Sequence, residues 1–150
     1  MARNAGNPRV RPGTWPLIAL VIWSLYVWST RISNAAGDAA LSTGSKAFSI
    51  GLSLTFVAFA LAGVVVLVRS WSRPRTGAEC NVLRSFAIWT VVVWAVRVPM
   101  ILLADHVVGF KVVHAMLGLI SIALAALVWR STTTAPVAAG AESLQPTSSR

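Results

Sequence analysis

Four long apolar runs divide the chain, and short polar segments separate them. The clearest run covers residues 47–68, where 22 consecutive positions carry no charged side chain. As a helix, such a run crosses a hydrocarbon core of ~30 Å. The other runs cover residues 16–32, 82–104 and 107–129. The pattern predicts an all-α integral membrane bundle of four transmembrane helices, forming one domain over residues 15–130.

The two ends of the chain differ from this apolar middle part. Residues 1–14 and 131–150 are polar and rich in small residues, so both are predicted to be disordered tails. A cleaved signal peptide is a competing interpretation of the first run, because the small residues SNAAG follow it. That run is long for a signal core and contains Trp23, Tyr26 and Trp28, which favours a retained span.

Charge is scarce and unevenly distributed. Hydrophobic residues make up 56% of the chain and charged residues 11%, with a net charge of +9. Nine Lys and Arg side chains lie in the two tails and around the second connection, against three (Arg31, Lys46 and Lys111) on the other side, with Arg97 counted as intramembrane. The positive-inside rule therefore predicts a cell (cytoplasmic) membrane protein with both termini in the cytoplasm. The sequence offers no basic, aromatic-laced soluble surface for nucleic acid.

Little in the sequence points to catalysis. The single cysteine, Cys80, cannot form an intrachain disulfide, which excludes four-helix oxidoreductases of the vitamin K epoxide reductase type, since these need paired cysteines. The sequence shows no zinc-ligand spacing, phosphate-binding loop or nucleophile motif. We expect no enzyme and no metal, and as partners membrane lipids, other membrane subunits or a second copy of the chain.

The ionisable residues near the last connection form the main candidate site. Residues 96–114, VRVPMILLADHVVGFKVVH, hold both histidines of the chain. The last two spans are joined almost without a loop, so they must be antiparallel neighbours. With a turn at Asp105 and His106, Arg97 lies level with His114, and Lys111 lies one helical turn nearer the surface. The side chains predicted to contact a ligand or partner in the outer leaflet are those of Arg97, Asp105, Lys111 and His114.

Each of these residues also has a simpler structural explanation. Asp105 is a candidate helix cap, Lys111 can extend to the headgroups, and His114 can be a helix contact. Arg97 can stack on Trp94, but an arginine at the bilayer centre costs ~2.5–3.5 kcal/mol on insertion scales. No predicted span contains Asp or Glu, so the expected anionic partner of Arg97 is Asp105, Asp38, a lipid headgroup, a ligand or another subunit.

Two rows of small residues predict where helices pack. Small residues at spacings of three and four allow close approach of helix backbones in lipid. The predicted rows are Gly51, Thr55, Ala58 and Ala62 in the second span, and Gly118, Ser121 and Ala125 in the fourth.

The last hairpin carries a family resemblance. Its segment DHVVGFKVVHAMLGLISIALAALVWR resembles uncharacterised small four-helix integral membrane proteins of actinobacteria, over about the last fifty residues. The resemblance implies a four-helix membrane fold and no activity.

These observations favour a non-catalytic membrane protein without a cofactor. It would be an accessory subunit or a binder of a lipid headgroup or anionic ligand through the outer-leaflet cationic cluster. The alternative is a redox or proton-coupled protein with His114 as a haem b ligand, quinone partner or proton relay. Two histidines on one haem are disfavoured within one chain, because His106 lies about two turns from His114. A small oligomeric transporter is a second alternative.

Overall fold

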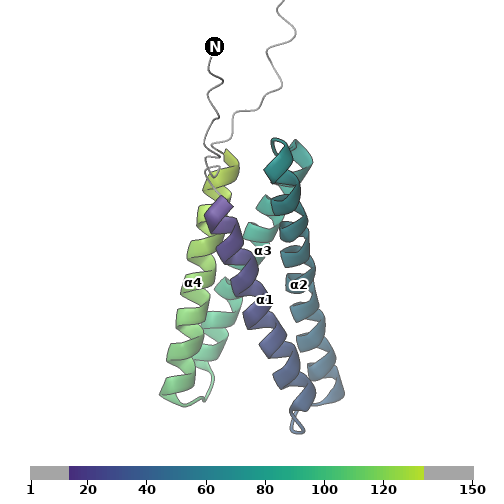
Figure 1. Ribbon diagram of the computed structural model, residues 1–150. Helices are drawn as coiled ribbons and strands as arrows, with labels where there is room; N and C mark the ends of the chain where they lie inside the picture. The colour runs from purple at the N-terminus through teal and green to yellow at the C-terminus, as the bar shows by residue number, and fades with distance from the viewer. Residues whose placement is uncertain (1–13, 134–150) are drawn as a thin grey trace, which may run out of the picture.

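The computed structural model describes residues 14–133 and consists of four helices (Figure 1). The helices are α1 (Thr14–Gly37), α2 (Thr43–Ser72), α3 (Gly77–Leu103) and α4 (Val108–Thr133). All four are long and apolar enough to span a membrane, judged by length and composition. The fold is all-α and compatible with a multi-pass membrane protein. Residues 1–13 and 134–150, which include nearly all of the predicted tails, lie outside the described residues.

The helices extend beyond the apolar runs that predict them. α1 continues to Gly37, whereas the apolar pattern ends near residue 32, and α2 begins at Thr43, four residues before its uncharged run. The Ser42 hydroxyl accepts a hydrogen bond from the backbone N–H of Ser45 at 3.2 Å and so caps α2. Polar residues continue these helices because backbone hydrogen bonds need no apolar side chain, so hydropathy alone underestimates helix length.

The chain forms two antiparallel hairpins, α1–α2 and α3–α4 (Figure 1). The described ends, Thr14 and Thr133, lie at one end of the bundle together with the α2–α3 connection, and we call this the terminal end. The connections at residues 38–42 and 104–107 lie at the opposite end, the hairpin-turn end. α1 runs beside α4 at the terminal end and beside α2 at the hairpin-turn end (Figure 1). The two hairpins therefore separate at the hairpin-turn end.

Aromatic side chains join three of the helices in the middle of the bundle. Trp28 of α1 stacks on Phe56 of α2 with ring centroids 3.9 Å apart, and its ring lies 6.2 Å from that of Trp94 in α3. All three side chains are buried. Lipid tails are as apolar as these side chains, so ring contact and close packing hold the helices together in a membrane.

Two hydrogen bonds link one hairpin to the other. The Trp23 Nε1–H donates to Ser121 Oγ at 2.9 Å and joins α1 to α4. The Trp89 Nε1–H donates to Thr55 Oγ1 at 3.1 Å and joins α3 to α2. Such bonds in membranes contribute about 0.6 kcal/mol on average, so they position the helices more than they stabilise them.

Small residues allow close helix contact in both hairpins. A Cβ added to Gly118 would lie 2.6 Å from Val98 Cγ2 and 3.0 Å from Trp94 Cε3, so α3 and α4 are in close contact there. A Cβ on Gly63 would lie 2.8 Å from Val21 Cγ2 of α1. Ser121 and Ala125, which share the face of Gly118, are also buried.

The buried face of α2 differs from the row of small residues predicted to pack. Gly51 and Ala58 are exposed, nothing lies within 4 Å of a Cβ at Gly51, and Ala62 is only half-buried. Thr55 is exposed but accepts the bond from Trp89. α2 instead packs against the other helices through a different face, whose buried residues are Ser49, Ser53, Phe56, Ala60, Gly63, Val66 and Ser70. All faces of α2 are apolar or small, so residue size could not identify the buried one.

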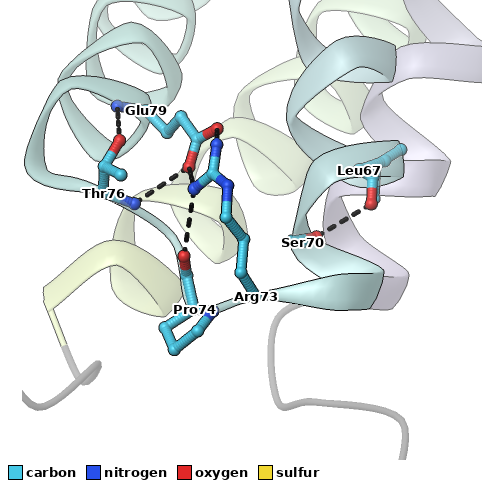
Figure 2. A network of polar contacts seen from close by, with 6 residues as sticks. All are labelled: Leu67, Ser70, Arg73, Pro74, Thr76 and Glu79. Carbon is cyan, nitrogen blue, oxygen red and sulfur yellow. Dashed lines mark hydrogen bonds and ion pairs between the residues drawn. The ribbon is translucent and has the colours of Figure 1, made fainter.

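A polar network fixes the α2–α3 connection (Figure 2). The Arg73 guanidinium forms two bonds to the Glu79 carboxylate, at 2.7 and 3.0 Å, and another to the Pro74 carbonyl. Glu79 also accepts from the Thr76 backbone N–H, while the Thr76 hydroxyl accepts from the Glu79 N–H. This capping box begins α3. The hydrogen bond to Glu79 raises the pKa of Arg73, so this pair stays charged at neutral pH.

Candidate functional site

A cleft opens between the two hairpins at the hairpin-turn end. Its volume is about 480 Å³, within the range of small-molecule sites. All four helices and both connections at this end contribute side chains. The lining residues are Arg31, Asn34, Ala35, Asp38, Leu41, Ser49, Arg97, Ile101, His106, Phe110 and His114. Two arginines and two histidines face a single carboxylate, Asp38, so we call this the cationic cleft.

Arg31 reaches the cleft from the inward face of α1. It lies three residues after the buried Trp28 and four before the buried Ala35, so it belongs to the same helix face. The side chain is half-buried, and its Nε is buried without a hydrogen-bond partner. A buried donor without a partner costs about 1–3 kcal/mol.

Arg97 projects into the cleft from α3, opposite Arg31. It is half-buried, and its positive charge acts on that of Arg31. Within residues 14–133, no carboxylate pairs with either arginine. The cation–π contact seen in this part of the chain joins Arg84 to Trp129, at 5.9 Å, rather than Arg97 to Trp94. In residues 14–133 the two guanidinium charges in the cleft therefore have no ion-pair partner.

His114 adds a hydrogen-bonding nitrogen to the same cleft. Its Nδ1 lies 2.9 Å from the Phe110 carbonyl oxygen. A carbonyl only accepts, so Nδ1 carries the hydrogen and Nε2 is left for another partner. The Phe110 ring contacts both imidazoles, with centroids 4.0 Å from His114 and 4.7 Å from His106. It thus lies between the two histidines.

The carboxylate in the cleft, Asp38, accepts a hydrogen bond from the backbone of its own loop. Asp38 is exposed in the α1–α2 connection, and its Oδ1 accepts a hydrogen bond from the Ala40 backbone N–H at 2.9 Å. This arrangement is an Asx turn, which shapes the connection. Asp38 lines the cleft but forms no ion pair with Arg31 or Arg97 in the described part of the chain.

The structure brings together some of the predicted site residues and separates others. Arg97 and His114 line the cleft together. Lys111 instead donates from Nζ to the Leu102 carbonyl at 2.9 Å, at the end of α3 where a cation is favoured. Asp105 is exposed in the α3–α4 connection and does not line the cleft. The cationic cluster consequently contains Arg97 and His114 but neither Lys111 nor Asp105.

Arg31 is absent from the predicted site, because it lies at the end of the first predicted span and was counted among the charges on the other side of the membrane. A signal was nevertheless present in its spacing. Positions four and three apart along α1 share one face, and all members of this series except Arg31 are buried. The series is Leu17, Val21, Ser24, Trp28, Arg31 and Ala35.

Two further cavities meet the cationic cleft at Arg97. One, about 480 Å³ and bounded by α2 and α3, shares Arg97, Ile101 and His106 with the cleft and is otherwise apolar. We call it the apolar groove; its other lining residues are Phe48, Leu52, Trp89, Val92, Val93, Val96, Met100 and Ala104. The second, about 300 Å³, lies on the α1–α4 side and shares Arg31, Arg97 and His114 with the cleft. Arg97 thus lies at the boundary between the cationic cleft and the apolar groove.

In residues 14–133, no cluster of three or more His, Cys, Asp or Glu side chains could hold a metal ion. No protein-family model, curated protein or solved structure matches the chain. What the site can do must therefore follow from its own chemistry. Two guanidiniums in one cleft can bind a phosphate or carboxylate with several charge-assisted hydrogen bonds.

Proposed function

We propose that this chain is a non-catalytic membrane protein that binds the anionic group of a ligand in the cationic cleft. The observation that carries the proposal is the convergence of Arg31 and Arg97, both half-buried, with no carboxylate paired to either in residues 14–133. The ligand class is a phosphate or carboxylate, borne by a lipid headgroup, a soluble molecule or a partner subunit.

An anion between the two arginines relieves two costs at once. It neutralises guanidiniums that otherwise repel each other, and it supplies an acceptor for the buried Arg31 Nε. Hydrogen bonds to charged groups contribute about 1.5–3 kcal/mol each. The guanidinium fork matches the paired oxygens of phosphate and carboxylate.

The distribution of charge supports an orientation for the site. Arg69, Arg73, Arg75, Arg84 and Arg130 all lie toward the terminal end in sequence. By the positive-inside rule that end faces the cytoplasm, which directs the cationic cleft to the outer leaflet of the cell membrane. The site then meets lipid headgroups and molecules arriving from outside.

Binding of phosphate-bearing probes to purified protein in neutral detergent tests the proposal. The probes are phosphatidylglycerol, followed by native mass spectrometry, and sn-glycerol 3-phosphate, followed by calorimetric titration. Arg31→Gln and Arg97→Gln each remove one guanidinium, whereas Arg69→Gln removes the same charge from an exposed position on α2. Loss of one charged hydrogen bond predicts at least about tenfold weaker binding of the phosphate probe.

The control decides what the result means. Weaker binding in both cleft variants with an unchanged Arg69→Gln protein supports the proposal. Equal losses in all three variants indicate only general attraction of anions to a basic protein and overturn it. A copurifying subunit, retained by wild type and lost from Arg97→Gln, identifies the bound anion as a carboxylate of a partner.

A further inference from the structure

The geometry points to an anionic membrane lipid as the ligand, with its phosphate on Arg31 and Arg97 and one acyl chain in the apolar groove. The inference rests on the proposed function and goes further, because it commits to an amphiphile. The observation behind it is the sharing of Arg97, Ile101 and His106 by the cationic cleft and the apolar groove.

The groove has a suitable extent for an acyl chain. Its lining continues along α3 from Arg97 to Trp89, eight residues or ~12 Å at 1.5 Å per residue. Half of a hydrocarbon core is ~15 Å. A lipid with its phosphate at the level of Arg97 would therefore lay its chain along α2 and α3, toward the bilayer midplane.

The groove is open to the side on which bilayer lipids would lie. Phe48, Val96 and Met100 line it and are 72%, 56% and 65% exposed. A chain can therefore enter laterally, without leaving the hydrocarbon region. A soluble anion would have no means of filling this space.

A small soluble anion satisfies the arginines but leaves the groove unoccupied. Apolar cavities exclude water, which needs two to four polar partners, and an unfilled apolar wall loses its dispersion contacts. Because an acyl chain is equally apolar in bulk lipid, the groove contributes through close packing around the chain, and this contribution is smaller than that of the charge-assisted bonds to the arginines. The arginines would hence supply most of the affinity, and the groove would select ligands that carry a chain.

Blocking the groove without altering the arginines tests the chain-binding step. Val96→Trp places a large side chain in the groove at an exposed position, and Val92→Phe is a second blocking variant of the same wall. Val65→Trp is the matched control, because Val65 is 48% exposed on α2 and lines none of the three cavities that meet at Arg97. The probes are phosphatidylglycerol in phosphatidylcholine nanodiscs and sn-glycerol 3-phosphate in solution.

We expect both blocking variants to retain phosphatidylglycerol about tenfold less well than wild type, a 1.4 kcal/mol effect. Binding of sn-glycerol 3-phosphate should not change, and Val65→Trp should match wild type with both probes. Unchanged lipid retention in Val96→Trp and Val92→Phe overturns the inference, as does wild-type binding of the soluble probe as tight as that of the lipid. A dimer that Val96→Trp dissociates also overturns it, because the groove would then hold a second copy.

The two proposals fail in different ways. If lipid retention survives blocking of the groove but is lost in Arg97→Gln, the anion site stands and the acyl-chain site does not. If retention survives Arg97→Gln and Arg31→Gln, the proposed function itself fails.

Discussion

Replacing Gly118 by Ala tests the contact that places α4 against α3 beside the cationic cleft. A Cβ at this position would lie 2.6 Å from Val98 Cγ2 and 3.0 Å from Trp94 Cε3, whereas ordinary contact begins at 3.4 Å. The Val98 methyl must therefore move by about 0.8 Å and the indole by about 0.4 Å. Both groups resist movement, because a valine in a helix has one strongly preferred rotamer and Trp94 is buried against Trp28.

The magnitude follows from the cost of overpacking. Overfilling a well-packed contact costs about 1–3 kcal/mol, and an off-rotamer valine alone accounts for about 0.5–1.5 kcal/mol. We expect Gly118→Ala to lower the free energy of unfolding by about 1–3 kcal/mol. His114 lies one helical turn away, so we also expect weaker binding of phosphate probes in the cleft.

Unfolding in mixed micelles by added sodium dodecyl sulfate, followed by tryptophan fluorescence, measures this change. Gly51→Ala is the matched control, because nothing lies within 4 Å of its added Cβ; it should be neutral, or more stable by up to about 1 kcal/mol. Equal stability of the two variants would refute the close approach of α3 and α4 at Gly118.

Three further predictions concern other contacts. Ser121→Ala leaves the Trp23 N–H without its acceptor and should lower the free energy of unfolding by about 0.6 kcal/mol in the same titration. Thr76→Ala removes the cap of α3, with an expected loss of about 1 kcal/mol in that assay. Cysteines replacing Arg97 and His114, in a protein without its native cysteine, should be joined rapidly by a short bifunctional reagent, because both positions line one cleft.

Each of these predictions has a control on the same chain. Ser131→Ala is the control for Ser121→Ala, because it loses only a bond within α4. Thr133→Ala is the control for Thr76→Ala, because it loses only a bond at the end of α4. If each control lowers the free energy of unfolding as much as its test variant does, the Trp23–Ser121 bond and the Thr76 cap contribute nothing specific. For crosslinking, a cysteine at Val112, which is 54% exposed and lines neither the cationic cleft nor its two neighbouring cavities, replaces the one at 114. Equal rates for the two pairs would contradict the placement of Arg97 beside His114.

Much of the candidate site was accessible from the sequence because it depends on local geometry. A connection of only a few residues forces α3 and α4 to be antiparallel, and the rise per residue then brings Arg97 to the depth of His114. Both do line the same cleft. The same rise per residue placed Lys111 one turn nearer the surface, beside the predicted cluster. Its long side chain, however, reaches the Leu102 carbonyl at the end of α3 instead of the cleft. Depth is a local property, whereas the direction of a long side chain depends on its neighbours.

By itself, the sequence determined four apolar helices, their approximate positions and the tight last hairpin, since hydropathy and connection length are properties of contiguous residues. Only the tertiary structure decided that Arg31 joins Arg97, and that α2 packs through Ser53 and Gly63 rather than Gly51. The physical reason is that a membrane-spanning helix is apolar on every side. Hydropathy therefore cannot distinguish the face that meets protein from the face that meets the membrane, and only the packing of the two hairpins against each other does so.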